Sequence, residues 1–180
     1  MANTLCDTLL SSDIMANCSH DGQLGFKRKA WIFNYEEVVK EASESEKVSW
    51  TLKNSARGYM LEQISKNPFE GTNSALVVGT YRNSFTHQVK LHVPDTAEVA
   101  PVMNEIASGK FIVCLDNGEG GIRVYGYYNG LKATEITNDP TSEDTDGGWV
   151  VTLEETKAKT CRLVFNGDAD ELDALCQATA

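Results

Sequence analysis

Apolar and polar residues alternate along residues 85–93, and this alternation is the clearest periodic pattern in the chain. The odd-numbered positions from Phe85 to Val93 are apolar except for His87, and the even-numbered positions between them are polar. A period of two is typical of a β-strand that turns one face toward a protein core. The pattern therefore predicts a half-buried strand, with His87 as a core or interface residue rather than a ligand.

Several other short apolar segments have the length and composition of β-strands. Turn-forming residues lie between many of them, as in the Pro, Gly and Asn cluster of residues 66–73. Many short strands separated by turn signals are typical of an antiparallel β-sandwich or barrel. The charged residues 36–48 fit either a short helix or an exposed loop. The expected strands lie at 28–35, 48–53, 57–64, 74–81, 85–93, 110–115, 122–128, 131–136, 148–155 and 161–165.

Residues 96–108 show the one convincing helical pattern, in which apolar side chains recur every three or four positions. These side chains are Val99, Val102, Met103 and Ile106. Asp95 and Glu98 fit a capping box at the start, and Gly109 fits a C-terminal stop. Pro101 must lie in the first turn or kink the helix. The apolar stripe predicts a helix that packs against the core.

A shorter helix is expected at about residues 168–178. Asp168 or Asp170 fits its N-cap, and Leu172 and Leu175 fit its buried side. Taken together, the elements predict a mainly β (α+β) fold, an antiparallel sandwich or barrel with one flanking helix and this C-terminal helix.

The domain organisation is expected to be simple. The chain has 180 residues, a length that suits one domain. Residues 1–26 lack periodicity and contain several Ser, Asn, Asp and Gly, so they are expected to form an N-terminal arm. This leaves residues 27–180 as a single β-rich domain.

The segment VYGYYNGL, residues 124–131, concentrates three tyrosines and two glycines between two strand-like runs. Asn129-Gly130 is a strong signal for a two-residue β-hairpin, because both residues tolerate the positive φ of a type I′ turn. A turn at these residues places Tyr128 opposite Leu131 on an apolar face. We therefore expect Tyr128 to point into the core.

The opposite face of that predicted hairpin is mixed in character. A neighbouring subunit or solvent would cover it, and tyrosine is enriched at protein interfaces. We interpret this face as a candidate subunit interface. Its residues are Tyr125, Tyr127, Lys132, Thr134 and Ile136.

The net charge of −10, from 16 basic and 26 acidic residues, argues against a surface that wraps nucleic acid. The longest apolar run, Phe111 to Leu115, is too short to cross a bilayer, so no membrane contact is expected. The first residues lack the basic and apolar segments of a secretory signal, so the protein is expected in the cytoplasm.

Candidate metal sites are weak. Cys6, Cys18 and His20 have no standard zinc spacing and no fourth ligand, so an ordinary arm is the preferred interpretation. The five cysteines include no C-x-x-C pair, and a disulfide framework is not expected.

Candidate ligand loops are equally weak. The glycine-rich residues 116–121 lead into a strand rather than a helix, which favours a hairpin loop over a phosphate site. The acidic residues of 138–148 lack EF-hand spacing, so a mobile acidic loop is preferred over a calcium site. Its acids are Asp139, Glu143, Asp144 and Asp146.

The chain contains no nucleophile elbow, no H-E-x-x-H sequence and no Walker loop. With three histidines, a histidine-based triad has few options. We therefore expect a non-enzymatic protein with no cofactor.

Four segments resemble tail-tube-like structural proteins of tailed-bacteriophage virions. They are NPFEGTNSALVVGTYRNSFTH, KFIVCLDN, VYGYYNGLKATEITND and DGGWVVTLEETKA, which cover much of residues 67–158. These are packing and turn motifs and carry no catalytic residue.

The resemblance implies a tail-tube-like β-sandwich or barrel whose copies join edge to edge into rings. Such rings form the tail tube or head–tail neck of a virion assembled in the host cytoplasm, contact other tail or neck proteins, and conduct DNA without binding it specifically. An acidic inner wall suits that passage, because it repels DNA. The acidic loop 138–148 is expected to face the lumen.

Three other functions remain open from the sequence. The chain fits a head-associated virion protein, such as a capsid decoration or head-fibre protein. A small carbohydrate-binding module would use the tyrosines. A hydrolase would use acidic residues that no motif identifies.

Overall fold

The computed structural model describes residues 25–42, 46–63 and 67–177. Most of the expected N-terminal arm, including Cys6, Cys18 and His20, lies outside the described residues. Phe26, which was assigned to that arm, packs against the core, with its ring 6.4 Å from the ring of Tyr125. Phe26 therefore contributes to the packing of the β-rich part of the chain.

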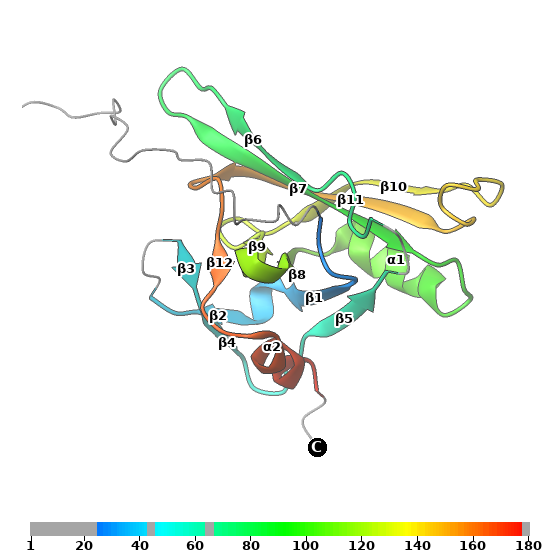
Figure 1. Cartoon of the computed structure of the whole chain (residues 1–180), viewed down its shortest axis with the longest axis horizontal. Coiled ribbons are helices and arrows are strands. Elements are labelled where there is room, and N and C mark those ends of the chain that lie inside the picture. Colours follow the sequence, from blue (N-terminus) through cyan, green and yellow to red (C-terminus); the bar gives the residue numbers. More distant parts are fainter. Residues whose placement is uncertain (1–24, 43–45, 64–66, 178–180) are drawn as a thin grey trace, which may run out of the picture.

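The described residues form twelve strands in three sheets and two α-helices, and the sheets do not close into a barrel (Figure 1). This confirms the mainly β expectation. The six-stranded sheet has the order β3 (Lys47–Val48), β12 (Val164–Phe165), β9 (Ile122–Tyr125), β8 (Phe111–Asp116), β1 (Lys29–Asn34) and β5 (Tyr59–Glu62). The four-stranded sheet has the order β10 (Lys132–Asn138), β11 (Trp149–Ala158), β7 (Ser84–Val93) and β6 (Asn73–Val77). The two-stranded sheet pairs β2 (Val38–Lys40) with β4 (Trp50–Leu52).

The six-stranded sheet is a central layer with a hydrophobic core on each face. Strand β8 shows this directly, since all six of its residues are buried. Ile112 and Cys114 belong to one core, whereas Val113 and Leu115 belong to the other. A strand buried on both faces has no polar alternation. This position explains the longest apolar run in the sequence.

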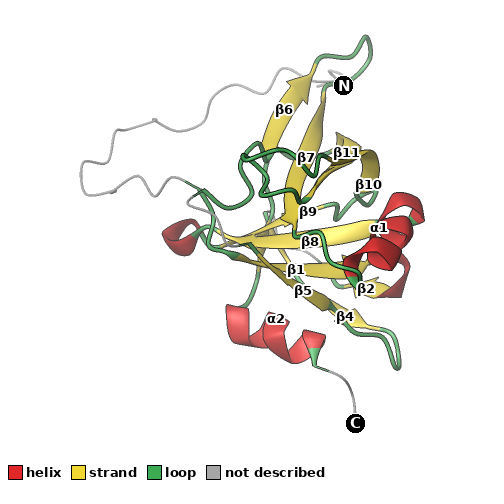
Figure 2. Cartoon of the chain, turned by 90° about the vertical axis from the view of Figure 1, so that its right-hand side faces the viewer, coloured by secondary structure: helices red, strands yellow, loops and turns green. Residues whose placement is uncertain are grey.

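Different elements pack over the two faces of the six-stranded sheet and complete the two cores. The four-stranded sheet and the helix α1 (Val99–Ser108) contribute to one core, whereas α2 (Ala169–Cys176) and the β2–β4 pair contribute to the other. Figure 2 shows α2 on the side of the six-stranded sheet that faces away from the four-stranded sheet. Asp173 fastens α2 to β1, because its carboxylate accepts 2.6 Å hydrogen bonds from Lys29 Nζ and Trp31 Nε1.

Strand β7 confirms the alternation seen in the sequence. His87, Val89, Leu91 and Val93 are buried, and the polar residues between them are only half-buried. Residues 36–48, by contrast, form no α-helix in their described part. That part contains a 3₁₀ turn at Tyr35–Glu37, strand β2 and strand β3.

Helix α1 begins at Val99, three residues later than expected, and the predicted capping box is wrong. Glu98 occupies the N-cap without a side-chain cap. Asp95 instead accepts a 2.9 Å hydrogen bond from Trp149 Nε1, which ties the start of the helical segment to β11. Pro101 lies in the first turn, and Gly109 is the C-cap, as expected. In α2, the Asp168 carboxylate accepts from the Glu171 N–H, which confirms the predicted N-cap.

Candidate functional site

Residues 126–131 carry the chain from one sheet to the other and do not form the predicted hairpin. Strand β9 pairs with β8 and β12, whereas β10 pairs with β11. The turn is closed by Gly130 N–H, which donates to Gly126 O at 2.9 Å. The positive φ values belong to Gly126 and Gly130, at 84° and 75°, and not to Asn129. A type I′ turn would require positive φ at Asn129, so the prediction was wrong about the turn and its register.

Glu155 of β11 holds this crossover turn. Its carboxylate accepts hydrogen bonds from the N–H groups of Gly126 at 3.0 Å and Asn129 at 2.6 Å, and the side chain is buried. A buried carboxylate is favourable only when such donors compensate for its lost hydration. Sequence reasoning missed Glu155 because nothing in the run of β11 distinguishes it from the half-buried Glu154 beside it.

The burial of the tyrosines contradicts the predicted faces. Tyr125 and Tyr127 are only 5% and 6% exposed, and they lie in different cores. Burial raises the pKa of Tyr125, and it does the same for Tyr127. Tyr128, which is expected in the core, is half-buried and packs against the core that contains Tyr127. In a continuous strand Tyr125 and Tyr127 would share a face, but β9 ends at Tyr125 and the chain turns at Gly126, whose φ is 84°, so the two rings lie in different cores.

The remaining residues of the predicted subunit interface lie on β10. This strand is one edge of the four-stranded sheet. Lys132 is exposed, and Ile136 is half-buried against the core. Their role in a subunit contact stays a prediction, but Tyr125 and Tyr127 no longer share an open surface with them.

An exposed apolar surface lies on the β6–β7 hairpin instead. Strand β6 is the other edge of the four-stranded sheet, and all five of its residues are exposed. The loop beyond it exposes 76% of Val78 and 93% of Tyr81. Figures 1 and 2 both show this hairpin extending past the rest of the sheet. We call Leu76, Val77, Val78 and Tyr81 the hairpin tip.

A second apolar surface is a groove of about 410 Å³ between the two sheets, beside α1. Ten of its thirteen lining residues are apolar or aromatic. Three of them, Tyr59, Met60 and Val102, are large side chains with substantial exposure. We call this cavity the apolar groove. Its lining consists of Ile32, Asn34, Tyr59, Met60, Leu61, Leu91, Val93, Val102, Met103, Glu105, Ile106, Gly109 and Phe111.

The hairpin tip and the apolar groove lie at opposite ends of strand β7. Ser84, at the start of β7, pairs with Val77 of the hairpin tip. Leu91 and Val93, at its end, line the groove. A strand of ten residues is about 30 Å long, so one chain cannot place its own tip in its own groove.

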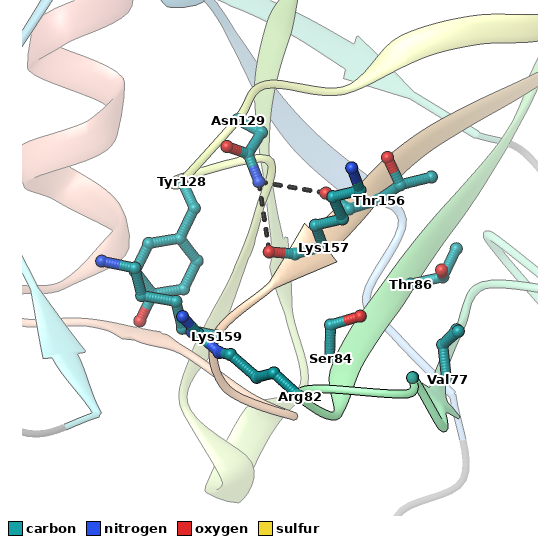
Figure 3. A pocket seen from close by; sticks show the side chains of 10 residues that line it. Val77, Arg82, Ser84, Thr86, Tyr128, Asn129, Thr156, Lys157 and Lys159 are labelled. Atoms are coloured by element: carbon teal, nitrogen blue, oxygen red, sulfur yellow. Dashed lines mark hydrogen bonds between the residues drawn. The ribbon is translucent and has the colours of Figure 1, made fainter.

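A basic pocket of about 660 Å³ lies at the hairpin end, between the start of β7, the end of β11 and the crossover turn (Figure 3). Arg82, Lys157 and Lys159 supply three positive charges, and no carboxylate of the residues that the structure describes lines the cavity. Lys159 lies over the ring of Tyr128, 5.6 Å from its centroid. We call this cavity the basic pocket.

Asn129 fixes the backbone at the mouth of the basic pocket. Its Nδ2 donates to the carbonyls of Thr156 and Lys157, at 3.0 and 3.4 Å (Figure 3). A β-bulge lies between Glu155 and Ala158, and within it Lys157 has a φ of 61°. A left-handed conformation costs a non-glycine residue about 1–2 kcal/mol, so the bulge needs such support.

The acidic loop joins β10 to β11 at the opposite end from the basic pocket (Figure 1). Asp139, Glu143, Asp144 and Asp146 are all exposed. Two hydrogen bonds from Thr141 lower the pKa of Asp139. Whether the loop faces a lumen stays a prediction.

His87 is a buried structural residue. Its Nε2–H donates to Thr160 O at 3.0 Å, and its Nδ1 accepts from the Ser74 hydroxyl at 2.7 Å. Desolvation lowers its pKa, which favours this neutral tautomer. A serine–histidine pair is also the geometry of a nucleophile and base. However, the cavity beside it measures about 10 Å³, which is room for one water at most and none for a substrate.

Within the described residues, no three His, Cys, Asp or Glu side chains gather as a metal site, and no helix is long and apolar enough to cross a membrane. Comparisons with protein families, with curated proteins and with solved structures found no match.

Proposed function

We propose that this chain is a non-enzymatic structural protein of a tailed-phage virion, whose copies join head to tail into a ring of the tail tube or head–tail neck. One structural observation supports the assembly step. Exposed apolar side chains concentrate on the hairpin tip and at the apolar groove, at opposite ends of one sheet. The sequence resemblance of residues 67–158 supplies the virion setting and the tail-tube-like architecture.

The distribution of exposed apolar side chains is uneven. Eight large hydrophobic side chains have substantial exposure in the described part of the chain, and seven of them belong to these two surfaces. The hairpin tip has four, the groove has three, and Val39 is the exception. Scattered apolar residues are ordinary on a protein surface, whereas clustered ones mark contact sites.

A protrusion at one end and a groove at the other fit a heterologous contact, in which the tip of one copy enters the groove of the next. Such contacts close into a ring when the rotation between copies permits it. Strand β6 also presents a free edge at the hairpin end, and pairing with a neighbour would protect it from unspecific association. In such a ring, the net charge of −10 would let DNA pass without adhering.

Electron microscopy and sedimentation velocity of the purified full chain test the proposal. The wild type should form rings or stacked rings as its concentration rises. A variant with Val78→Asp and Tyr81→Asp should stay monomeric, because two charges cannot be desolvated in an apolar groove.

Val39→Asp is the matched control, because Val39 is exposed to the same 45% as Val77 but lies outside both surfaces. It should assemble like the wild type. A wild type that remains monomeric at every concentration, also with neck or tail proteins present, would overturn the proposal. Binding to capsid shells without ring formation would assign the chain to the head-associated class instead.

A further inference from the structure

The basic pocket is an anomaly in a chain with a net charge of −10. Three cationic residues line one cavity, and Glu155, which holds the adjoining turn, is buried with both carboxylate oxygens accepting backbone N–H groups. The hydroxyl-bearing residues Ser84, Thr86, Thr156 and Tyr128 also line the cavity, whereas the Asn129 amide already donates to two backbone carbonyls. This set of donors fits a negatively charged group with several oxygen atoms.

The acidic loop has the complementary composition. Four exposed carboxylates lie within eight positions, and no basic residue occurs between Lys132 and Lys157. The loop precedes β11, whereas Thr156 and Lys157 of the pocket lie at the end of the same strand. The strand separates them by roughly 25 Å, so no salt bridge within one chain can join them.

The basic pocket and the acidic loop lie at the same two ends of the four-stranded sheet as the hairpin tip and the apolar groove. Val77 and Arg82 place the basic pocket beside the hairpin tip. Val93, which lines the apolar groove, pairs with Trp149 at the base of the acidic loop. A head-to-tail contact that inserts the tip into the groove therefore brings a basic end toward an acidic end.

We infer that the basic pocket receives the acidic loop of the next copy, so that carboxylates of residues 139–146 pair with Arg82, Lys157 and Lys159 across each subunit contact. This inference rests on the proposed self-assembly and names its charged component. It places the acidic loop at the contact between copies rather than on the wall of a lumen. Complementary charge at the rim of an interface chiefly sets specificity and register, and salt screens it.

Two charge-reversed chains test the pairing. The first carries Lys157→Glu and Lys159→Glu, so its pocket and its loop are both negative. The second carries Glu143→Lys, Asp144→Lys and Asp146→Lys, which leaves Asp139 as the one acid among the four loop positions, so both are positive. Each should self-associate at least about 100-fold more weakly than the wild type at low salt, since like charges in contact cost several kcal/mol.

A 1:1 mixture of the two chains should recover the assembly. Each negative loop then meets a positive pocket, and each positive loop meets a negative pocket, in alternating copies. Lys47→Glu with Lys53→Glu is the control for the change in net charge, since both residues are exposed and lie outside the two ends. It should assemble like the wild type. Circular dichroism and thermal melting of each chain establish that it is folded.

The outcomes separate this inference from the proposed function. If each reversed chain assembles normally, the charge pairing is wrong but the proposed self-assembly still holds. That result is the one expected if the pocket binds a free anion instead of the acidic loop. Reversed chains that fail alone and also fail when mixed would likewise overturn the pairing. A wild type that never assembles would overturn the proposed function itself.

Discussion

Two segments with the same V-x-G-x-Y pattern have opposite environments in this molecule. Residues 77–81, VVGTY, form the exposed end of the β6–β7 hairpin, whereas residues 124–128, VYGYY, run from the end of β9 into the crossover between the sheets. Val78 is 76% exposed, and the corresponding Tyr125 is 5% exposed. The pattern itself therefore says nothing about burial. What differs is whether the chain leaves the sheet edge into solvent or passes between two packed sheets.

This difference separates folding from assembly. Apolar side chains of the crossover lie in the two cores and are expected to support the folded state. Those of the hairpin tip are exposed within the described part of the chain and are available to another copy. Substitutions in the two segments should therefore affect different measurements.

The largest expected effect is on the crossover. Tyr127→Ala removes a buried ring that lies 6.2 Å from the ring of Trp50 and should lower the free energy of unfolding by about 3–5 kcal/mol. Tyr81→Ala should change it by no more than about 0.5 kcal/mol, because its ring is almost fully exposed. Urea denaturation of both variants measures the contrast. Equal losses would show that the hairpin tip is part of the folding unit.

A smaller loss is expected when the turn loses its buried acceptor. In Glu155→Gln, one side-chain oxygen can still accept a backbone N–H, but the amide NH₂ faces the second donor. Removing this charged partner should cost about 1.5–3 kcal/mol in urea denaturation. Glu154→Gln is the control on the same strand and should cost little. Equal stability of the two variants would mean that Glu155 does not hold the turn.

A substitution in the hairpin tip should weaken self-association while leaving the free energy of unfolding nearly unchanged. Tyr81→Ala is expected to weaken self-association at least about tenfold, because large aromatic side chains dominate the energetics of interfaces. Dilution experiments by sedimentation velocity measure this change. Normal assembly of the variant, with a loss of stability instead, would reverse the roles assigned to the two segments.

The smallest expected effect concerns pH, through His87 beside the crossover. Burial lowers its folded-state pKa below 6.5, so the unfolded chain binds more protons between the two values. Its contribution to stability is therefore complete above about pH 6.5 and falls as the pH drops toward the folded-state pKa. His87→Gln should show a shallower loss of stability on acidification. Parallel pH profiles for the two proteins would argue against a neutral buried His87.

The sequence predicted the structure correctly where a segment depends on local spacing alone or has one uniformly buried face. Strand β7 has one buried face, so its alternation was visible in the sequence. Asp168 caps its helix through a contact three residues away, which spacing alone can identify. The capping box predicted at Asp95 is wrong because local spacing cannot reveal distant contacts. The Asp95 carboxylate instead accepts a hydrogen bond from Trp149, which lies 54 residues away.

The candidate site was harder to predict, because it depends on contacts between distant segments. Asn129-Gly130 indicated a turn, but local propensity cannot tell a hairpin from a crossover between sheets. The apolar residues of β6 gave no sign that their strand would lie at an edge. The basic pocket combines residues from three parts of the chain, and only the packing of β7, β11 and the turn brings Arg82 and Lys157 together.

One mixing measurement tests the central claim, a head-to-tail contact between hairpin tip and apolar groove. One chain carries Val78→Asp and Tyr81→Asp, which disable the tip, and the other carries Met60→Asp and Val102→Asp, which disable the groove. Each should be monomeric alone in sedimentation velocity. Because the first retains an intact groove and the second an intact tip, their 1:1 mixture should form a dimer and nothing larger. Two chains that remain monomeric when mixed, or that form large assemblies separately, would contradict the account.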